Sequence, residues 1–214
     1  MRRILAGFAG FAILALVAAN AAWAQTAPVE GRAFRTFDPA QASPRDRIEV
    51  IEFFYYGCPV CYETEPQLAR WLQGAGPDVR LRRVPAANPV AWESFARTYY
   101  TLEAMGELER LHWAVYDNHH FDDRRLDVEA NVEAWAGANG VDAARFRSIW
   151  HSLETRQKVE FARHMLGTYD VHGVPTFVVD GRYATSPKMA GGVKESIAVL
   201  DALVRLARNE HAKH

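Results

Sequence analysis

The order of apolar and polar positions predicts a strand, a helix and a second strand in the first half of the chain. Residues 48–56 are β-branched or aromatic apart from Glu49 and Glu52, which is typical of a buried strand. Gly57 ends this run, and a helical pattern then extends to about residue 74, with Pro59 early in it. Residues 79–84 form the next apolar run. Together these segments predict a βαβ unit and a parallel pair of strands.

The second half of the chain is helical at first and returns to strand character near its end. Apolar residues recur at helical spacing from about residue 91 to about residue 170, with no strand signal. Residues 176–179 predict a strand, Asp180-Gly181 a turn, residues 182–184 a second strand, and residues 193–208 a closing amphipathic helix. A short strand is also expected within residues 32–37. The fold class is therefore α/β.

The first residues have the order of a secretory signal peptide. Arg2 and Arg3 precede an apolar run from Ile4 to Ala19, and small residues stand at positions 22 and 24. We expect cleavage after Ala24 and export to the periplasm. An uncleaved membrane anchor is the alternative, although the run is at the short end for spanning a bilayer.

The net charge of the chain bears on whether nucleic acid is a partner. Residues 1–24 hold two of the 25 basic residues and none of the 26 acidic ones, so their removal leaves a net charge of −3. This balance gives no reason to expect nucleic-acid binding. The remaining residues are numerous enough to bury a sizeable core without a disulfide scaffold.

The two cysteines are the strongest indication of chemistry. Cys58 and Cys61 are three positions apart, so a disulfide between them closes a very short loop and stabilises the fold little. In an exported protein such a pair favours thiol exchange. Cys58 is expected at the start of the helix, where free N–H groups and the helix dipole stabilise a thiolate, and Cys61 is expected to face inward.

A zinc half-site or an inert disulfide is the structural alternative for this pair. A metal site needs further ligands, but the sequence has no other cysteine, and His119-His120 lacks a partner motif. We therefore expect redox chemistry, with no metal and no cofactor.

A proline directly before the strand at 176–179 is the second feature of note. Pro175 lacks the N–H that a central strand needs, which places it at the strand boundary, and the bond from Val174 is a candidate cis peptide. The alternative is an ordinary trans loop proline.

With both features present, the sequence resembles the thioredoxin superfamily and, within it, the DsbA-like periplasmic thiol:disulfide interchange proteins. The matching residues are Glu52-Phe53-Phe54, Cys58-Pro59-x-Cys61-Tyr62 and Gly173-Val174-Pro175. The resemblance implies a thioredoxin fold with an inserted helical subdomain. Residues 25–90 and 171–214 would form the thioredoxin-like domain, and residues 91–170 the insertion.

The same resemblance implies roles for individual residues. Cys58 would be the nucleophile and Cys61 the resolving cysteine, forming the redox-active disulfide. Pro175 would be the cis-proline facing them, and Val174 would offer backbone groups to an extended client. Pro59 and Val60 complete the expected client-binding set.

Glu52 matches the family's buried acid, which relays a proton to or from Cys61. Its alternative is an acid on an exposed strand face. The family's lysine partner has no clear counterpart, because Arg82 or Arg83 occupies that strand and arginine does not give up a proton.

Val60 stands where the family usually has a histidine that helps to stabilise the thiolate. We therefore expect Cys58 to be less acidic, and the disulfide less oxidising, than in proteins with histidine there. Tyr55, Tyr56, Val60 and Phe177 are candidates for an apolar rim that accepts unfolded clients, with a plain core role as the alternative.

The resemblance implies a monomeric oxidoreductase that donates its disulfide to reduced exported proteins and is reoxidised by a DsbB-like membrane quinone reductase. A thioredoxin-like reductant or isomerase would use the same residues with a different redox partner. A chaperone-like binding module with vestigial cysteines is the alternative from another class.

Overall fold

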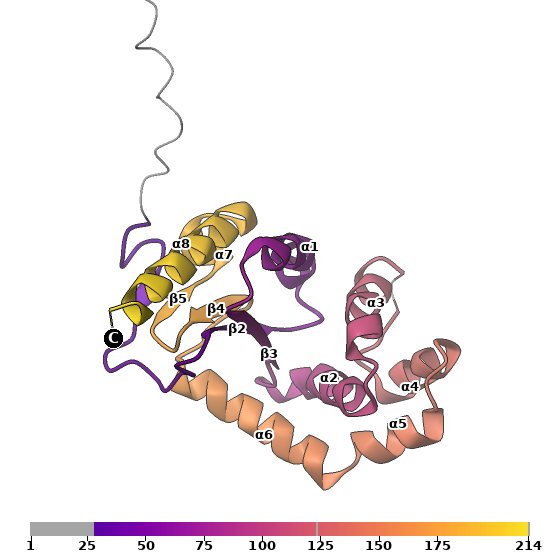
Figure 1. The fold of residues 1–214 in the computed structure, drawn as a ribbon. Coiled ribbons are helices and arrows are strands. Elements are labelled where there is room, and N and C mark those ends of the chain that lie inside the picture. Colours follow the sequence, from indigo (N-terminus) through magenta and orange to yellow (C-terminus); the bar gives the residue numbers. More distant parts are fainter. Residues whose placement is uncertain (1–27, 123, 214) are drawn as a thin grey trace, which may run out of the picture.

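The computed structural model describes residues 28–122 and 124–213, which form a mixed five-stranded sheet with helices on both faces (Figure 1). The strand order is β1-β5-β4-β2-β3, with β2 parallel to β3 and the other neighbouring pairs antiparallel. The strands are β1 (Arg35–Thr36), β2 (Ile48–Phe54), β3 (Val79–Pro85), β4 (Thr176–Val179) and β5 (Tyr183–Thr185). The expected leader and its cleavage after Ala24 lie outside the described residues.

Helices α1 and α8 cover one face of the sheet, and α2 and α6 contact β3 at the other side (Figure 1). The helices are α1 (Pro59–Gly74), α2 (Glu93–Met105), α3 (Leu108–His120), α4 (Glu129–Ala138), α5 (Ala143–Trp150), α6 (Leu153–Thr168), α7 (Pro187–Ala190) and α8 (Val193–His211), with a 3-10 turn η1 (Val90–Trp92) before α2. Within the described ranges, none of these helices has both the length and the apolar character needed to cross a bilayer.

Alternation along β2 determines what each of its side chains faces. Successive strand residues point to opposite faces, so Ile48 and Val50 join the core beneath α1 and α8, whereas Ile51 and Phe53 join the core on the helical side. Glu52 follows Val50 by two positions and therefore points toward α1. The central strand thus carries a carboxyl group to the underside of the helix that bears the cysteines.

The helices from α2 to α6 share a hydrophobic core with the sheet. Phe53 of β2 packs against Tyr169, just after α6, with the ring centroids 5.7 Å apart. Both residues belong to a cluster that continues through Phe95, Tyr116 and Phe146. The expected division at residues 91 and 170 remains a prediction, and the core is continuous across both positions.

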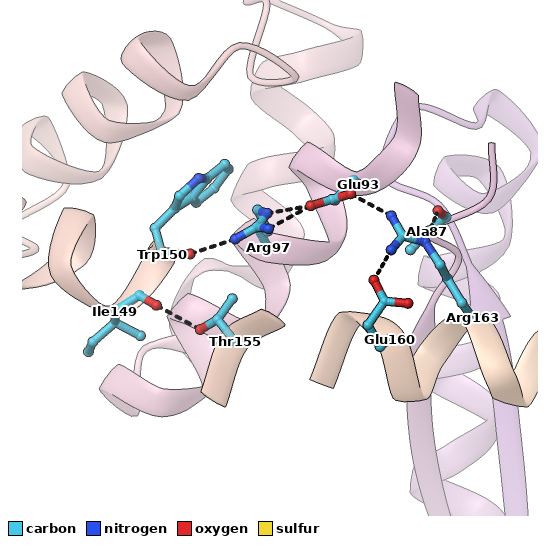
Figure 2. A network of polar contacts seen from close by, with 8 residues as sticks. All are labelled: Ala87, Glu93, Arg97, Ile149, Trp150, Thr155, Glu160 and Arg163. Carbon is cyan, nitrogen blue, oxygen red and sulfur yellow. Dashed lines mark hydrogen bonds and ion pairs between the residues drawn. The ribbon is translucent and has the colours of Figure 1, made fainter. Parts of the chain in front are cut away.

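A polar network joins three helices of this block to the segment that leaves β3 (Figure 2). Glu93 of α2 accepts hydrogen bonds from Arg97, at 2.7 Å, and from Arg163 of α6. Arg97 also donates to the Trp150 carbonyl at the end of α5, at 2.9 Å, and Arg163 donates to the Ala87 carbonyl, at 3.1 Å. Glu93 therefore links α2 to α6 through Arg163, and Arg97 links α2 to α5.

Several element boundaries differ from the sequence expectation. The strand expected within 32–37 is limited to Arg35–Thr36. The apolar periodicity of residues 108–116 ends at Tyr116, but helix α3 continues to His120, although Asp, Asn and His are weak helix formers. Tertiary hydrogen bonds hold this last turn, from Tyr62 to Asp117 at 3.0 Å and from Trp135 to Asn118 at 2.9 Å. Such contacts have no local sequence signal.

Helix α7 was not expected, although its start has a clear cap. The Ser186 hydroxyl accepts a hydrogen bond from the Met189 N–H at 3.2 Å, and Pro187 follows at the first helical position. A four-residue helix is too short for hydrophobic periodicity to reveal.

Candidate active site

The first turn of α1 presents Cys58 to the surface and Cys61 to the interior. Cys58 is the N-cap residue in an extended conformation, with Pro59 at the first helical position, as the sequence predicted. Its N–H donates to the Tyr55 carbonyl at 3.0 Å, which fixes the turn from β2 into the helix. Both cysteines are free thiols, Cys58 partly exposed and Cys61 buried. The reachable sulfur is therefore that of Cys58.

The two thiols differ strongly in acidity. The hydrogen bond from the Cys61 thiol is the largest cause that lowers the pKa of Cys58, and the backbone N–H groups of Cys61 and Val60 add to it; the pKa falls to about 6 despite partial burial. Burial and the adjacent Cys58 sulfur raise the pKa of Cys61 well above the ordinary thiol value. One thiol is thus poised as a thiolate near neutral pH, and the other is held protonated.

A loop before β4 faces Cys58 and contains the predicted cis peptide. The Val174–Pro175 bond is cis, and the Cys58 thiol donates to the Val174 carbonyl at 3.5 Å. Among the described residues no group accepts a hydrogen bond from the Val174 N–H. Pro175 is buried at the strand boundary, where its missing N–H leaves no ladder bond unmade. The loop therefore offers a free backbone donor beside the reactive sulfur.

Glu52 is fully buried beneath the cysteine pair, so the exposed-face alternative is wrong. Its Oε2 accepts a hydrogen bond from Arg83 Nε at 3.1 Å, because β2 and β3 place these two residues opposite each other. Arg82 instead pairs with Glu49 at 3.1 Å. Burial, followed by the charge of Glu65, raises the pKa of Glu52 to about 8, and Arg83 opposes the rise only in part. Glu52 therefore holds a proton at neutral pH.

Two further residues of this buried cluster, Glu65 and His112, were not identified from the sequence. Glu65 of α1 receives the second hydrogen bond of Arg83, and His112 of α3 lies near Glu65, with 3.6 Å between Nε2 and Oε1. The other ring nitrogen of His112 is 2.7 Å from the Tyr56 hydroxyl. His112 shares the spacing of Leu111 and Val115, which are buried on α3, and this periodicity was the available signal.

Half of the expected apolar rim is core. Tyr56, just after β2, and Phe177 of β4 are completely buried, so for these two the core alternative is confirmed and the client-surface candidate is wrong. Val60 is 39% exposed, Pro59 is exposed, and Tyr55 is half-buried against Trp92, with its ring stacked at 4.1 Å. The exposed apolar surface next to Cys58 is therefore formed by the first turn of α1 and the Tyr55–Trp92 stack.

A cleft of about 360 Å³ adjoins the cis-proline loop. Val174 lines one end of it, and the other walls come from the segment after β3 and from the end of α6, with Pro89, Trp92, Leu166 and Val171 among the lining residues. Val174 also contacts Cys58, so the cleft and the exchange site share this residue. In the described part of the chain, no three His, Cys, Asp or Glu side chains gather in a way that could hold a metal ion.

A cysteine pair on the first turn of a helix, opposite a cis-proline loop on a mixed sheet, defines the thioredoxin-fold thiol:disulfide oxidoreductases. The profile of the DSBA-like thioredoxin domain matches residues 49–203. The chain belongs to this family and is a thiol:disulfide oxidoreductase.

Individual relatives agree with the family match. The thiol:disulfide interchange protein DsbA of Pseudomonas aeruginosa is 34% identical over 170 residues, which cover 79% of this chain and 81% of the relative. That of Burkholderia cepacia is 31% identical over 199 residues, 92% of this chain and 94% of the relative. The crystal structure of P. aeruginosa DsbA has a TM-score of 0.81 at 31% identity and covers 87% of this chain and 97% of that chain. The oxidoreductase DsbA of Xylella fastidiosa has a TM-score of 0.79 at 27% identity, with coverage of 85% and 98%.

Proposed function

We propose that the protein oxidises reduced exported proteins by donating the Cys58–Cys61 disulfide to them. The observation that carries this proposal is the contrast between the two thiols, one exposed and acidic and the other buried and weakly acidic. A stable Cys58 thiolate stabilises the reduced enzyme relative to the disulfide, and this makes the disulfide a stronger oxidant.

The exchange takes place in two displacements. A client thiolate attacks the Cys58 sulfur, the Cys58–Cys61 bond breaks, and Cys61 leaves as a thiolate. A second client thiolate then attacks the client sulfur of the mixed disulfide, and Cys58 leaves as a thiolate. The client loses two electrons and forms its disulfide, and the enzyme gains them as two reduced cysteines.

Glu52 supplies the proton for the first displacement. Glu52 is protonated near neutral pH. When it is ionised instead, its negative charge raises the pKa of the Cys61 thiol, so the two groups interact directly. A thiol pKa well above that of the acid makes transfer from Glu52 to the leaving thiolate favourable. In the reverse direction the ionised carboxylate takes the Cys61 proton before Cys61 attacks a mixed disulfide.

Val174 and the cleft beside it hold the client. The free Val174 N–H pairs with an extended segment in the manner of an added strand, which requires no particular client sequence. Pro59, Val60 and the cis Pro175 shape the surface around the sulfur. This arrangement suits many unfolded proteins with accessible thiols.

Location and recycling complete the proposal. The residues before position 25 have the pattern of an export signal, so the mature protein works in the periplasm, as a monomer. The reduced enzyme passes its electrons to a DsbB-like quinone reductase in the inner membrane. An electron-accepting partner of this class is required because the two-electron reduction of the enzyme must be reversed after every turnover.

Two cysteine variants test the function. We expect Cys58→Ala to abolish oxidation of a reduced, unfolded client, measured as loss of free client thiols. We expect Cys61→Ala to accumulate client mixed disulfides that a reductant releases on gels. Full activity in either variant would contradict the proposal, and aggregation suppression with a silent wild type would favour the binding module.

The equilibrium potential of the pair against glutathione separates an oxidant from a reductant or isomerase. An oxidant has a potential well above that of the reducing thioredoxins. A potential in the reducing range, with the pair found reduced in vivo, would reverse the assigned direction of electron flow.

A further inference from the structure

Five polar side chains meet in the interior between α1, β2, β3 and α3. They are two carboxyls, one guanidinium, one imidazole and one phenol, contributed by Glu52, Glu65, Arg83, His112 and Tyr56. Four of them are buried and Arg83 is largely buried. Charged groups are seldom buried unless their partners fix them, so the division of charge within this cluster matters.

The two carboxyls compete for one cation. Arg83 donates through Nε to Glu52 at 3.1 Å and through Nη2 to Glu65. One guanidinium neutralises one carboxylate, and a second buried negative charge next to the first is costly. The other contacts of Glu52 and Glu65 therefore determine which of the two acids is ionised. The second oxygen of Glu52, Oε1, is buried without a hydrogen-bond partner in the described part of the chain.

Glu65 has an additional neighbour, the imidazole of His112. Its Nε2 lies 3.6 Å from Glu65 Oε1, slightly longer than a hydrogen bond, so the contact is electrostatic. Only the tautomer with a proton on Nε2 presents a positive edge to the carboxylate. That tautomer leaves Nδ1 as an acceptor, and the Tyr56 hydroxyl, 2.7 Å away, is the donor that it needs.

We propose that His112 is a positioning residue of the exchange reaction: oriented by Tyr56, it stabilises Glu65 as the ionised acid and thereby leaves the proton on Glu52, beneath Cys61. The proposal rests on the proposed function, because Glu52 acts on Cys61 only in disulfide exchange. The five side chains interact in series, in the order Tyr56, His112, Glu65, Arg83 and Glu52. His112 does not touch the sulfur and acts through the other members.

The acidities of the groups agree with this division of charge. Burial opposes the charge of Glu65, but the contacts with His112 and Arg83 outweigh it and hold the pKa of Glu65 below its usual value. Burial lowers the pKa of His112, so the imidazole is neutral. Glu65 and Arg83 then form the charged pair, and Glu52 retains its proton.

The other titratable groups that face Glu52 leave this balance unchanged near neutral pH. They are Cys61 of α1, Tyr56 in the turn after β2, Tyr99 of α2 and Tyr116 of α3. Burial raises the pKa of each of these groups, the three tyrosines and the thiol, above its ordinary value. Each therefore stays protonated and uncharged while Glu52 titrates.

Replacement of His112 tests the proposal through a pH profile. We expect His112→Leu to make ionised Glu65 less stable, so that Arg83 pairs with Glu52 instead. The midpoint of the Glu52 titration should then move to lower pH by about one unit. The direct readout is the pH dependence of the Glu52 carboxyl-carbon chemical shift in NMR. The functional readout is the pH dependence of glutathione release from its mixed disulfide with Cys58, which requires Cys61 to lose a proton.

Matched variants separate positioning from general damage to the core. His112→Gln keeps an N–H donor toward Glu65 and is expected to restore much of the wild-type profile. Tyr56→Phe removes the orienting donor and is expected to shift the profile in the same direction as His112→Leu. His119→Leu removes a histidine of the same helix whose Nδ1 contacts the Arg124 carbonyl outside the Glu52–Glu65 cluster, and it should leave the profile in place.

A double-mutant cycle shows whether His112 acts through Glu65. Glu65→Gln removes the competing charge and is expected to lower the titration of Glu52 by itself. In that background His112→Leu should add no further shift, because its target is gone. Should His112→Leu fail to fold, Tyr56→Phe, with and without Glu65→Gln, carries the same comparison.

An unchanged Glu52 titration in His112→Leu, or an equal shift with and without Glu65, would overturn the inference. The wild type would still oxidise clients in that case, and the proposed function would stand. Failure of the proposed function appears differently, as a wild type without exchange activity.

Discussion

The thiol sulfur of Cys58 lies 3.5 Å from the carbonyl oxygen of Val174, the residue that precedes the cis proline. The two residues are far apart in the sequence, and the antiparallel pairing of β2 with β4 brings them together. The residue that we propose to align the client segment is therefore in direct contact with the reactive sulfur. A client bound there, as proposed, would carry its own sulfur past Cys58.

The acidity of Cys58 makes the stability of the reduced protein depend on pH. The folded pKa of about 6 lies below the ordinary value of 9.0, so the unfolded chain holds a proton between these values that the folded chain has released. We expect the free energy of unfolding of the reduced protein to rise with pH through this window, and the gain to be lost as pH falls through about 6.

The oxidised protein is the control for that measurement, because its Cys58 cannot ionise. Glu52 acts in the opposite direction, since its folded pKa of about 8 lies above the ordinary 4.5 and it binds a proton in the folded state between these values. The difference between reduced and oxidised curves removes much of that contribution. Chemical denaturation at several pH values measures the free energy of unfolding of the reduced and of the oxidised protein. If the two free energies changed with pH in parallel, an acidic Cys58 would be contradicted.

Val60→His is expected to make the enzyme a stronger oxidant. Val60 is the second of the two residues between the cysteines and is 39% exposed. Its side chain offers no hydrogen-bond donor to the thiolate. An imidazole there adds a hydrogen bond or a positive charge, which lowers the pKa of Cys58 further and stabilises the reduced form. Redox titration against glutathione measures the potential, and Val60→Leu is the matched control. Equal potentials in wild type and Val60→His would refute the expectation.

Glu52→Gln is expected to slow the steps in which Cys61 gains or loses a proton, by roughly 10²-fold. The amide keeps the shape and accepts a hydrogen bond from Arg83, but it neither donates a proton to a thiolate nor accepts one. Stopped-flow measurement of client oxidation and of glutathione release gives the two rates. Glu49→Gln, on the same strand and paired with Arg82, is the control. A normal rate in Glu52→Gln would place the proton source elsewhere.

Glu93→Gln is expected to destabilise the protein by about 1–2 kcal/mol, because Arg97 and Arg163 lose a charged acceptor in a partly buried site. Both arginines keep a backbone carbonyl, which limits the loss. Urea denaturation measures it, and double-mutant cycles with Arg97→Ala and Arg163→Ala apportion it. Glu154→Gln breaks an exposed pair with Lys158 and should change stability far less.

The sequence predicted the parts of the fold that have a local signal. The apolar run of β2, the proline after Cys58 and the proline before β4 each carry a physical constraint that one segment expresses alone. Val174–Pro175 was predicted as a cis candidate because a central strand cannot accommodate proline. The choice of Arg83 over Arg82 as the partner of Glu52 was not predictable, because it depends on the register between β2 and β3.

The buried members of the site were hidden for a different reason. Glu65 follows Glu63 on a helix that also carries exposed polar residues, and glutamate on such a helix is ordinarily solvated. His112 belongs to a helix far along the chain, and only the fold brings it beneath α1. Tyr56 was a candidate for either a client surface or the core, and the sequence did not indicate that its hydroxyl points into the interior toward His112.

His112 belongs to α3, within the helical block, whereas Glu52, Glu65 and Arg83 belong to the strands and helix of the thioredoxin unit. The block is therefore more than a lid or an enlarged docking surface, since one of its side chains completes the interior of its host. An engineered miniature that joined β3 directly to β4 would keep both cysteines and lose the imidazole. Transplanting the cysteine helix into a smaller scaffold would transfer the sulfur atoms without the electrostatics that surround them.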